Sequence, residues 1–157
     1  MRKVLALLTF AIILSSCSQD IRFSNPALQG DVDGEVWRSS SHEARIVNGS
    51  VNITAMRGFE KLEITIGSTA IGQTHTFGLA GNSRAVFTID APSNLTVYDT
   101  QAANGAGQII IDEINTTQRY ISGEIIFFDA PVATGLPIYG ELFNFSRGIF
   151  FKIPLRN

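Results

Sequence analysis

The chain has 157 residues, of which 45% are hydrophobic and 17% charged, with a formal net charge of −2 at neutral pH. A chain of this length suits one domain that buries roughly two thirds of its unfolded surface, enough for a core without disulfides. Beyond the adjacent Arg2 and Lys3, its lysines and arginines are scattered singly, which argues against nucleic acid or an anionic membrane surface as a partner.

The N-terminal segment has the three parts of a secretory signal peptide. Arg2 and Lys3 precede an apolar run over residues 4–14, and two serines then lead to Cys17, the only cysteine. As a helix the apolar run would rise about 16 Å, against roughly 30 Å for the hydrocarbon core of a bilayer, so it is too short for an ordinary transmembrane anchor. We predict that residues 1–16 are a signal peptide.

The sequence around Cys17 predicts a lipid anchor. Leu14-Ser15-Ser16-Cys17 resembles the lipobox of bacterial lipoproteins, which implies a diacylglycerol on the Cys17 sulfur and the membrane as a partner. Two or three acyl chains hold a protein stably on a bilayer. Removal of residues 1–16 takes away two basic residues and no acid, so 10 basic and 14 acidic residues remain, a formal charge of −4. Residues 17–26 are predicted to be the lipidated cysteine and a short polar tether.

From residue 27 onwards the chain is typical of a β domain. Apolar residues alternate with polar ones over residues 51–55, 62–66, 85–89 and 95–98, as expected of half-buried strands. Turn signals separate these runs, and Asn48-Gly49 is the clearest signal for a two-residue hairpin. No stretch after the signal peptide shows a sustained helical period.

The last third of the chain predicts central strands and a closing hairpin. Residues 109–111 and 125–128 are apolar at successive positions, so we expect both faces to be covered and Phe127 to lie in the core. Residues 139–145 and 149–153 are predicted to pair across Ser146-Arg147-Gly148. We therefore expect a single all-β domain over residues 27–157, an antiparallel β-sandwich or partly closed β-barrel.

The search for catalytic and metal sites gives weak candidates. His42 follows three serines, but a catalytic serine needs a base and an oxyanion hole that the fold brings together, and a serine run is ordinary loop composition. His75 alternates in phase with Phe77 and Leu79, which favours a partly buried strand residue. With two histidines and no second cysteine, the spacing of a zinc site is missing.

Acidic residues give no better case for an enzyme. Asp112, Glu113 and Glu124 are expected on the solvated face of neighbouring strands, although glycoside hydrolysis needs only two carboxylates at the right separation. Asp31 to Glu35 resembles a calcium loop superficially, but its glycine comes too early and its distal glutamate is missing, so a plain Asp-Gly turn is favoured. We predict no enzymatic activity, no cofactor and no metal.

Aromatic residues are the remaining candidates for binding. Trp37 follows a tight turn, and Tyr98, Tyr120 and Tyr139 are expected at or near strand ends. Such side chains could form a platform for a glycan or a peptide. For Trp37 the simpler interpretation is a core residue or one that covers a hairpin.

Several motifs together resemble the small uncharacterised lipoproteins of Bacteroidota. The resemblance rests on the lipobox and on the stretches at residues 32–37, 107–111, 120–127 and 140–143, including Gly34-Glu35-Val36-Trp37 and Tyr120-Ile121-Ser122-Gly123. It implies a β domain of unknown function on an outer-membrane lipoprotein, and it carries over no catalytic residues.

These observations predict a lipid-anchored lipoprotein of the cell envelope that acts as a non-enzymatic binding or structural module, with an envelope protein or a glycan as its partner. Two alternatives stay open: an accessory subunit of an outer-membrane complex, and a hydrolase.

Overall fold

The computed structural model describes residue 25 and residues 27–157. The predicted signal peptide, Cys17 and most of the predicted tether lie outside the described residues. The described part consists of strands and turns, which confirms the prediction of an all-β fold. Within it, no helix has the length and apolar character needed to span a membrane.

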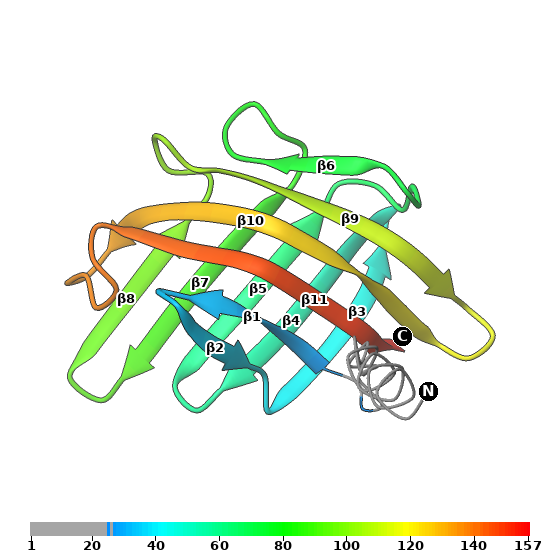
Figure 1. The fold of residues 1–157 in the computed structure, drawn as a ribbon, viewed down its shortest axis with the longest axis horizontal. Helices are drawn as coiled ribbons and strands as arrows, with labels where there is room; N and C mark the ends of the chain where they lie inside the picture. The colour runs from blue at the N-terminus through cyan, green and yellow to red at the C-terminus, as the bar shows by residue number, and fades with distance from the viewer. Residues whose placement is uncertain (1–24, 26) are drawn as a thin grey trace, which may run out of the picture.

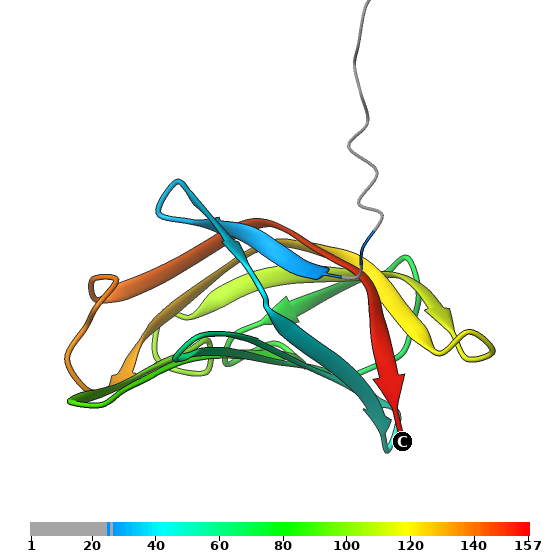
Figure 2. The same cartoon turned by 90° about the horizontal axis from the view of Figure 1, so that it is seen from below.

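Eleven strands form one sheet that folds into two layers (Figures 1 and 2). In chain order they are β1 (Ala27–Val32), β2 (Glu35–Arg38), β3 (Ser41–Val47), β4 (Ser50–Arg57), β5 (Glu60–Ile66), β6 (Thr74–Phe77), β7 (Arg84–Ala91), β8 (Asn94–Asp99), β9 (Ala106–Asn115), β10 (Tyr120–Thr134) and β11 (Leu142–Arg156).

One layer has the strand order β2-β1-β11-β10-β9-β6, and the other has the order β3-β4-β5-β7-β8. The two long strands join the layers at opposite corners. The end of β11 pairs in parallel with β3, at Leu155 and Ala44, and the end of β10 pairs with β8, at Val132 and Tyr98. The result is a sandwich whose corners are closed by hydrogen bonds, in agreement with a partly closed barrel.

The hydrophobic alternation places the core between the layers as the sequence predicts. The apolar residues at alternate positions of β4, β5 and β7 are buried, and their polar neighbours face outwards. The turns are confirmed at Asp33-Gly34 and at Asn48-Gly49, where all four residues have positive φ between 51° and 83°. Such angles at both central positions give the two-residue turn that suits the twist of a hairpin.

The predicted terminal hairpin is wrong, because β11 runs without reversal from Leu142 to Arg156. Ser146 pairs with Phe127 and Gly148 with Ile125, so β10 continues along both halves of the strand. Arg147 has a φ of 50° and lies where the pairing of β11 with β1 shifts by one residue, which is a bulge. A Cβ on Gly148 would lie 2.7 Å from the ring of Phe145, so close packing explains this glycine better than a turn.

Two predicted side-chain directions are also wrong. The pairing of β10 with β9 shifts between Ile125 and Phe127, so Phe127 turns to the outer face, partly exposed, and Phe128 fills the core instead. In β8 the polar residue Thr96 is buried, whereas Leu95 is 51% exposed. In β10 the bulge shifts the alternation of buried and exposed side chains by one residue. In β8 Thr96 points inwards because its hydroxyl bonds the β10–β11 loop.

Candidate functional site

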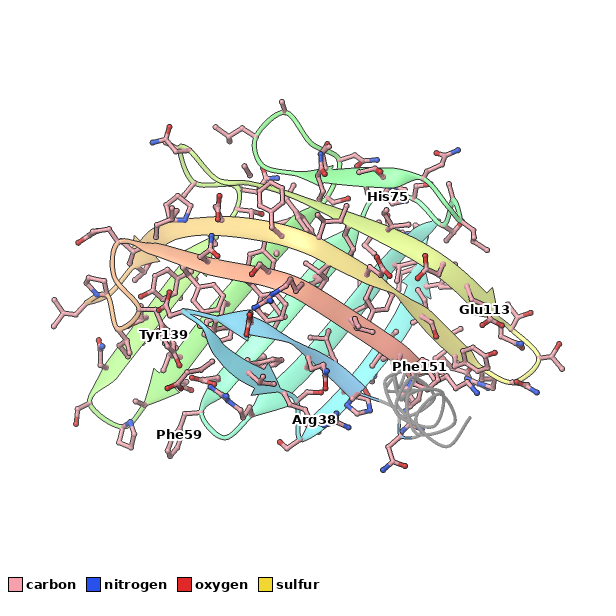
Figure 3. The ribbon with its side chains drawn as sticks, in the orientation of Figure 1. Arg38, Phe59, His75, Glu113, Tyr139 and Phe151 are labelled. Carbon is pink, nitrogen blue, oxygen red and sulfur yellow. The ribbon has the colours of Figure 1, made fainter. Side chains whose placement is uncertain are left out.

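One end of the molecule, at the left and lower left in Figure 1, is formed by three connections. They are the β4–β5 turn at residues 58–59, the β7–β8 turn at residues 92–93 and the β10–β11 loop at residues 135–141. We call these connections and the strand residues next to them the rim. Phe59 and Tyr139 both lie at this end in Figure 3.

Beneath the rim, four side chains form a polar group that we call the Glu60 cluster: Trp37, Arg57, Glu60 and Tyr139. Oε2 of Glu60 accepts hydrogen bonds from Nε1 of Trp37 at 2.8 Å and from Nε of Arg57 at 2.7 Å. Oε1 accepts one from the hydroxyl of Tyr139 at 2.6 Å. The guanidinium of Arg57 also lies 5.6 Å from the centre of the Trp37 ring. One carboxylate thus connects β2, β4, β5 and the β10–β11 loop.

The electrostatics of the cluster fix its protonation state at neutral pH. Burial favours a raised pKa for Glu60, but hydrogen bonds from Arg57, Tyr139 and Trp37 outweigh it and hold the pKa below its usual range. Burial, together with the hydrogen bond to Glu60, raises the pKa of Tyr139 to about 12. The carboxylate therefore stays charged and the phenol stays protonated, which suits a structural clamp better than an acid or base that exchanges protons with a substrate.

We expect Glu60→Gln to lower the free energy of unfolding at neutral pH by about 1–3 kcal/mol, because one charge of a half-buried network is lost. Since the pKa of Glu60 is depressed in the folded state, the charged carboxylate stabilises the fold above its unfolded pKa. That stabilisation is lost as the pH falls through the folded pKa, below 4.5.

The measurement is denaturant unfolding of the original protein and of the variant between neutral pH and about pH 3, where the difference in stability should shrink. Glu124→Gln is the matched control, because Glu124 is exposed and makes no ion pair within the described residues. A difference that stays constant down to the acid end would contradict the role of the charge.

The β10–β11 loop is held from below by buried residues of β8. The hydroxyl of Tyr98 accepts hydrogen bonds from the backbone N–H groups of Ile138 and Tyr139, both at 2.9 Å, and donates to the carbonyl of Gly140 at 3.1 Å. The hydroxyl of Thr96 donates to the carbonyl of Leu136 at 2.6 Å. Because these bonds replace water on the loop backbone, the loop is fixed although it has no regular structure of its own.

Above this support the rim exposes large apolar side chains. The β4–β5 turn is tied to β7 by the N–H of Asp90, which donates to the carbonyl of Phe59 at 2.9 Å. Beside Phe59 lies a cleft of about 340 Å³ lined by residues of β4, β5 and β7, among them Met56, Lys61 and Asp90. The exposed fractions of the five apolar residues of the rim are 64% for Phe59, 51% for Leu95, 74% for Leu136, 49% for Ile138 and 45% for Leu142.

The charges at this end are mostly negative. Four exposed carboxylates lie on the rim or on the adjacent β1–β2 hairpin, and none makes an ion pair within the described residues: Asp33, Glu35, Asp90 and Glu141. The two cations next to the β4–β5 turn are both paired, Arg57 with Glu60 and Lys61 with Glu63. The rim is therefore an apolar and acidic surface on a support of buried hydrogen bonds.

The structure separates the four predicted aromatics. Trp37 and Tyr98 are fully buried, Trp37 in the core with its N–H on Glu60, and Tyr98 beneath the loop. Tyr139 is half-buried in the Glu60 cluster, and Tyr120 lies at the opposite end, where its hydroxyl donates to Glu113 at 2.7 Å. Three of them support the rim from inside, and they do not form an exposed platform.

The histidines have structural surroundings. Nδ1 of His42 lies 3.0 Å from the hydroxyl of Ser39, which also accepts a hydrogen bond from the N–H of Leu28 at 3.1 Å. Ser39 is buried, so its hydroxyl has little access to a substrate. Burial, helped by the charge of Arg38, lowers the pKa of His42. His75 is buried in β6 with Nε2 3.1 Å from the carbonyl of Ala70, in agreement with its predicted strand position.

The acidic candidates are exposed, as predicted. Asp112, Glu113 and Glu124 have exposed side chains on β9 and β10. Within residue 25 and residues 27–157, no three histidine, cysteine, aspartate or glutamate side chains are grouped so that they could hold a metal. The Asp33-Gly34 step is an ordinary hairpin turn.

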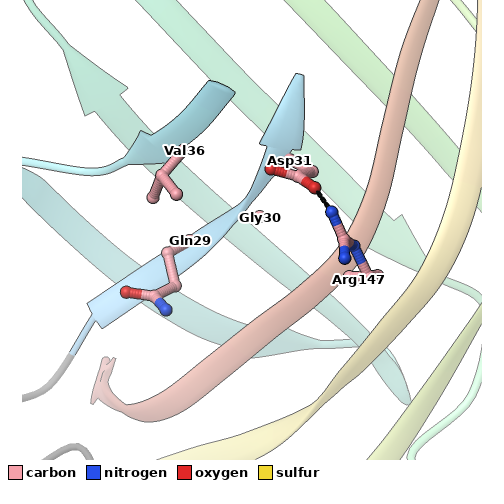
Figure 4. Close-up of a pocket in the computed structure, with 5 residues that line it drawn as sticks. All are labelled: Gln29, Gly30, Asp31, Val36 and Arg147. Atoms are coloured by element: carbon pink, nitrogen blue, oxygen red, sulfur yellow. Dashed lines mark ion pairs between the residues drawn. The ribbon is translucent and has the colours of Figure 1, made fainter. Parts of the chain in front are cut away.

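A second groove, of about 260 Å³, lies on the outer face of β1, β2 and β11 (Figure 4). An ion pair between Asp31 and Arg147 crosses it and joins β1 to β11. Val36, 69% exposed, is the only large apolar side chain along it. With a single apolar wall and its charges already paired, this groove is a weaker binding surface than the rim.

Sequence reasoning missed the rim because its apolar residues follow no period. Leu136 and Ile138 lie in a loop, and Leu95 faces away from the core. One signal was available: Phe59 stands in a two-residue turn between the predicted strands, a position where polar residues and glycine are usual.

Comparison with known proteins identifies a family. Residues 24–154 match the model of a family described as a domain of unknown function (DUF6252). No curated protein and no solved structure gives a match.

Proposed function

Because the chain belongs to the DUF6252 family, whose description states no function, we propose a role from the geometry: a lipid-anchored, non-enzymatic module of the cell envelope that binds another protein through its rim. The anchor is the lipid on Cys17, and the membrane is the outer membrane. The partner carries a surface that is both apolar and basic.

One observation carries this proposal: five large apolar side chains stand exposed on the rim, three of them on a turn and a loop and two at the adjoining ends of β8 and β11. Buried polar groups hold the loop in place. Exposed apolar residues are ordinary when they are scattered, but a group at one end of a small domain marks a surface that is covered in use. Pre-ordered loops also lose little entropy when they bind, which favours affinity.

The charge of the rim favours a protein partner over a glycan. Its exposed carboxylates attract lysine and arginine side chains, and its apolar residues fit aliphatic or aromatic side chains of a partner. Glycan platforms in proteins rely on exposed aromatic rings with polar neighbours, whereas Trp37 and Tyr98 are buried here. The alternative of an accessory subunit in an envelope complex uses the same surface and differs in how permanent the contact is.

The proposal is tested by affinity capture of the native lipoprotein from gently solubilised envelopes. We expect Phe59→Ala combined with Leu136→Ala to reduce the capture of its specific partner about tenfold or more, since exposed anchors at the centre of an interface each contribute 1 kcal/mol or more, roughly. Val36→Ala is the matched control, because Val36 is equally exposed but lies outside the rim.

Equal recovery of the same proteins with the original rim and with the double variant would contradict the proposal. Rising salt should weaken capture further if the rim carboxylates take part, because exposed charge pairs are screened. Loss of capture with Val36→Ala but not with the rim variant would move the binding surface to the groove on β1 and β2.

A further inference from the structure

We infer that the end of the domain opposite the rim lies against the membrane, where Tyr120, Phe151 and Lys152, with Arg119 and Arg156, contact the anionic phosphate headgroups. This inference rests on the lipid anchor of the proposed function. It gives the bound module an orientation and places the rim away from the bilayer.

The long strands β10 and β11 separate the Phe151 end of the domain from the rim. Ala27, the first strand residue, pairs with Phe151 of β11, and Tyr120 pairs with Pro154 of the same strand. From Tyr120, β10 runs 15 residues to Thr134, where the rim loop begins, a path of about 46 Å along the strand. In Figure 3, Glu113 and Phe151 lie at one end and Tyr139 and Phe59 at the other.

The length of the chain before the domain limits how far this end can be from the lipid. Cys17 and Asn25 are eight residues apart, so even a fully extended chain spans roughly 29 Å between them. The chain enters the domain at Ala27, which pairs with Phe151, and about 30 Å of β11 separate Phe151 from Leu142 at the rim. A lipid on Cys17 therefore holds the Phe151 end within the reach of the tether, and the rim lies farthest from the bilayer when the domain stands on this end.

The side chains at this end fit a lipid headgroup region. The ammonium of Lys152 lies 5.4 Å from the centre of the Tyr120 ring and 5.3 Å from that of Phe151, and both rings are half-buried. Aromatic residues with a polar edge and lysines with a long apolar stem are the residues that favour the interface between water and lipid. The ammonium group of Lys152 can contact a lipid phosphate while the rings of Tyr120 and Phe151 stay at the level of the headgroups.

The two ends also differ in their charges, because the Phe151 end carries cations without ion pairs in the described part of the chain. Arg119, Lys152 and Arg156 make no ion pair within the described residues, and Arg119 instead donates to the carbonyl of Leu155 and to Oδ1 of Asn157. Asp112 and Glu113 lie nearby on β9, and Glu113 accepts the hydroxyl of Tyr120. Basic residues that are scattered singly in the sequence are thus brought together by the β9–β10 turn and the end of β11. The acidic rim, in contrast, is repelled by an anionic surface.

The test uses the lipoprotein as isolated from envelopes, reconstituted into phosphatidylcholine vesicles with and without phosphatidylglycerol. Oxidative labelling of side chains is compared between the two kinds of vesicle. We expect labelling of Tyr120 and Phe151 to fall about threefold when phosphatidylglycerol is present, while labelling of Phe59 and Leu136 stays the same. Arg119→Glu combined with Lys152→Glu should remove the protection, and Lys61→Glu, which reverses a cation beside the rim, should keep it.

Protection of Phe59 and Leu136 in place of Tyr120 and Phe151 would overturn the orientation, and so would equal labelling of Tyr120 and Phe151 in both kinds of vesicle. The mass of the peptide that contains Cys17, from the same preparation, reports whether the lipid is present. Absence of the lipid would overturn the anchor itself, whereas a lipidated protein without protection would overturn only the orientation.

Discussion

Phe143→Ala is expected to lower the free energy of unfolding by about 3–5 kcal/mol, because it empties the centre of the aromatic core. Phe143 is fully buried and stacks on Phe87 with ring centres 4.1 Å apart. It also contacts the rings of Tyr98 at 5.4 Å, Tyr139 at 5.5 Å and Phe128 at 5.9 Å. The cavity would lie beneath the rim, so its support would weaken together with the core.

Chemical unfolding followed by far-ultraviolet circular dichroism measures this effect, and the native spectrum should be of the β type. Phe59→Ala is the matched control, since the same atoms are removed from a side chain that is 64% exposed, and its cost should stay under about 1 kcal/mol. Similar losses of stability in the two variants would show that the core is not where the structure places it.

Cys17→Ala is expected to abolish acyl labelling and to release the protein from the membrane fraction. The sulfur of the only cysteine is the proposed site of the lipid, and no other acyl attachment signal stands in the sequence. Loss of two or three acyl chains removes nearly all of the affinity for a bilayer, because each buried methylene contributes about 0.8 kcal/mol.

The measurement is metabolic labelling with a fatty acid, combined with fractionation of envelopes. Ser16→Ala keeps a small residue before the cysteine and serves as the control that should be labelled and retained. Undiminished labelling of Cys17→Ala would end the lipoprotein interpretation, and retention without labelling would point to an anchor other than lipid.

Much of the fold could be predicted because local rules and the tertiary structure agree. Residues 51–55 and 62–66 alternate cleanly, and Asn48-Gly49 adopts the positive φ angles that its turn requires. The positions of the β-bulges could not be predicted from the sequence. Gly148 reads as a turn residue in the sequence, but its role is to let Phe145 and Ile125 pack closely, which only the paired strands reveal.

The site was less predictable because its residues come from separate elements. Glu60 looks like a surface residue at the start of a strand, yet it gathers Trp37, Arg57 and Tyr139 from three other segments. Tyr98 and Thr96 break the apolar pattern of β8, since they point inwards to bond the loop at residues 135–141. Alternation of apolar and polar residues does not predict a polar residue that is buried because it bonds a loop.

In the proposed function, the anchor and the binding surface lie at opposite ends of the domain. If the lipid holds the Phe151 end, the rim stands at the other end, where we propose that a partner protein binds. The same β10 and β11 strands that close the barrel also separate the two surfaces. The Glu60 cluster then has a structural role, because it connects β2, β4, β5 and the β10–β11 loop at the end that we propose to bind a partner.

Site-specific photocrosslinking in intact cells tests the central claim most directly. A photoreactive phenylalanine analogue in place of Phe59 should join the lipoprotein to one discrete protein partner. The same analogue in place of Val86, on the outer face of β7 away from the rim, should give no such product. The account predicts a crosslink at position 59 that disappears when Leu136→Ala and Asp90→Asn are added. The absence of any crosslink at position 59, together with a discrete product at position 86, would contradict it.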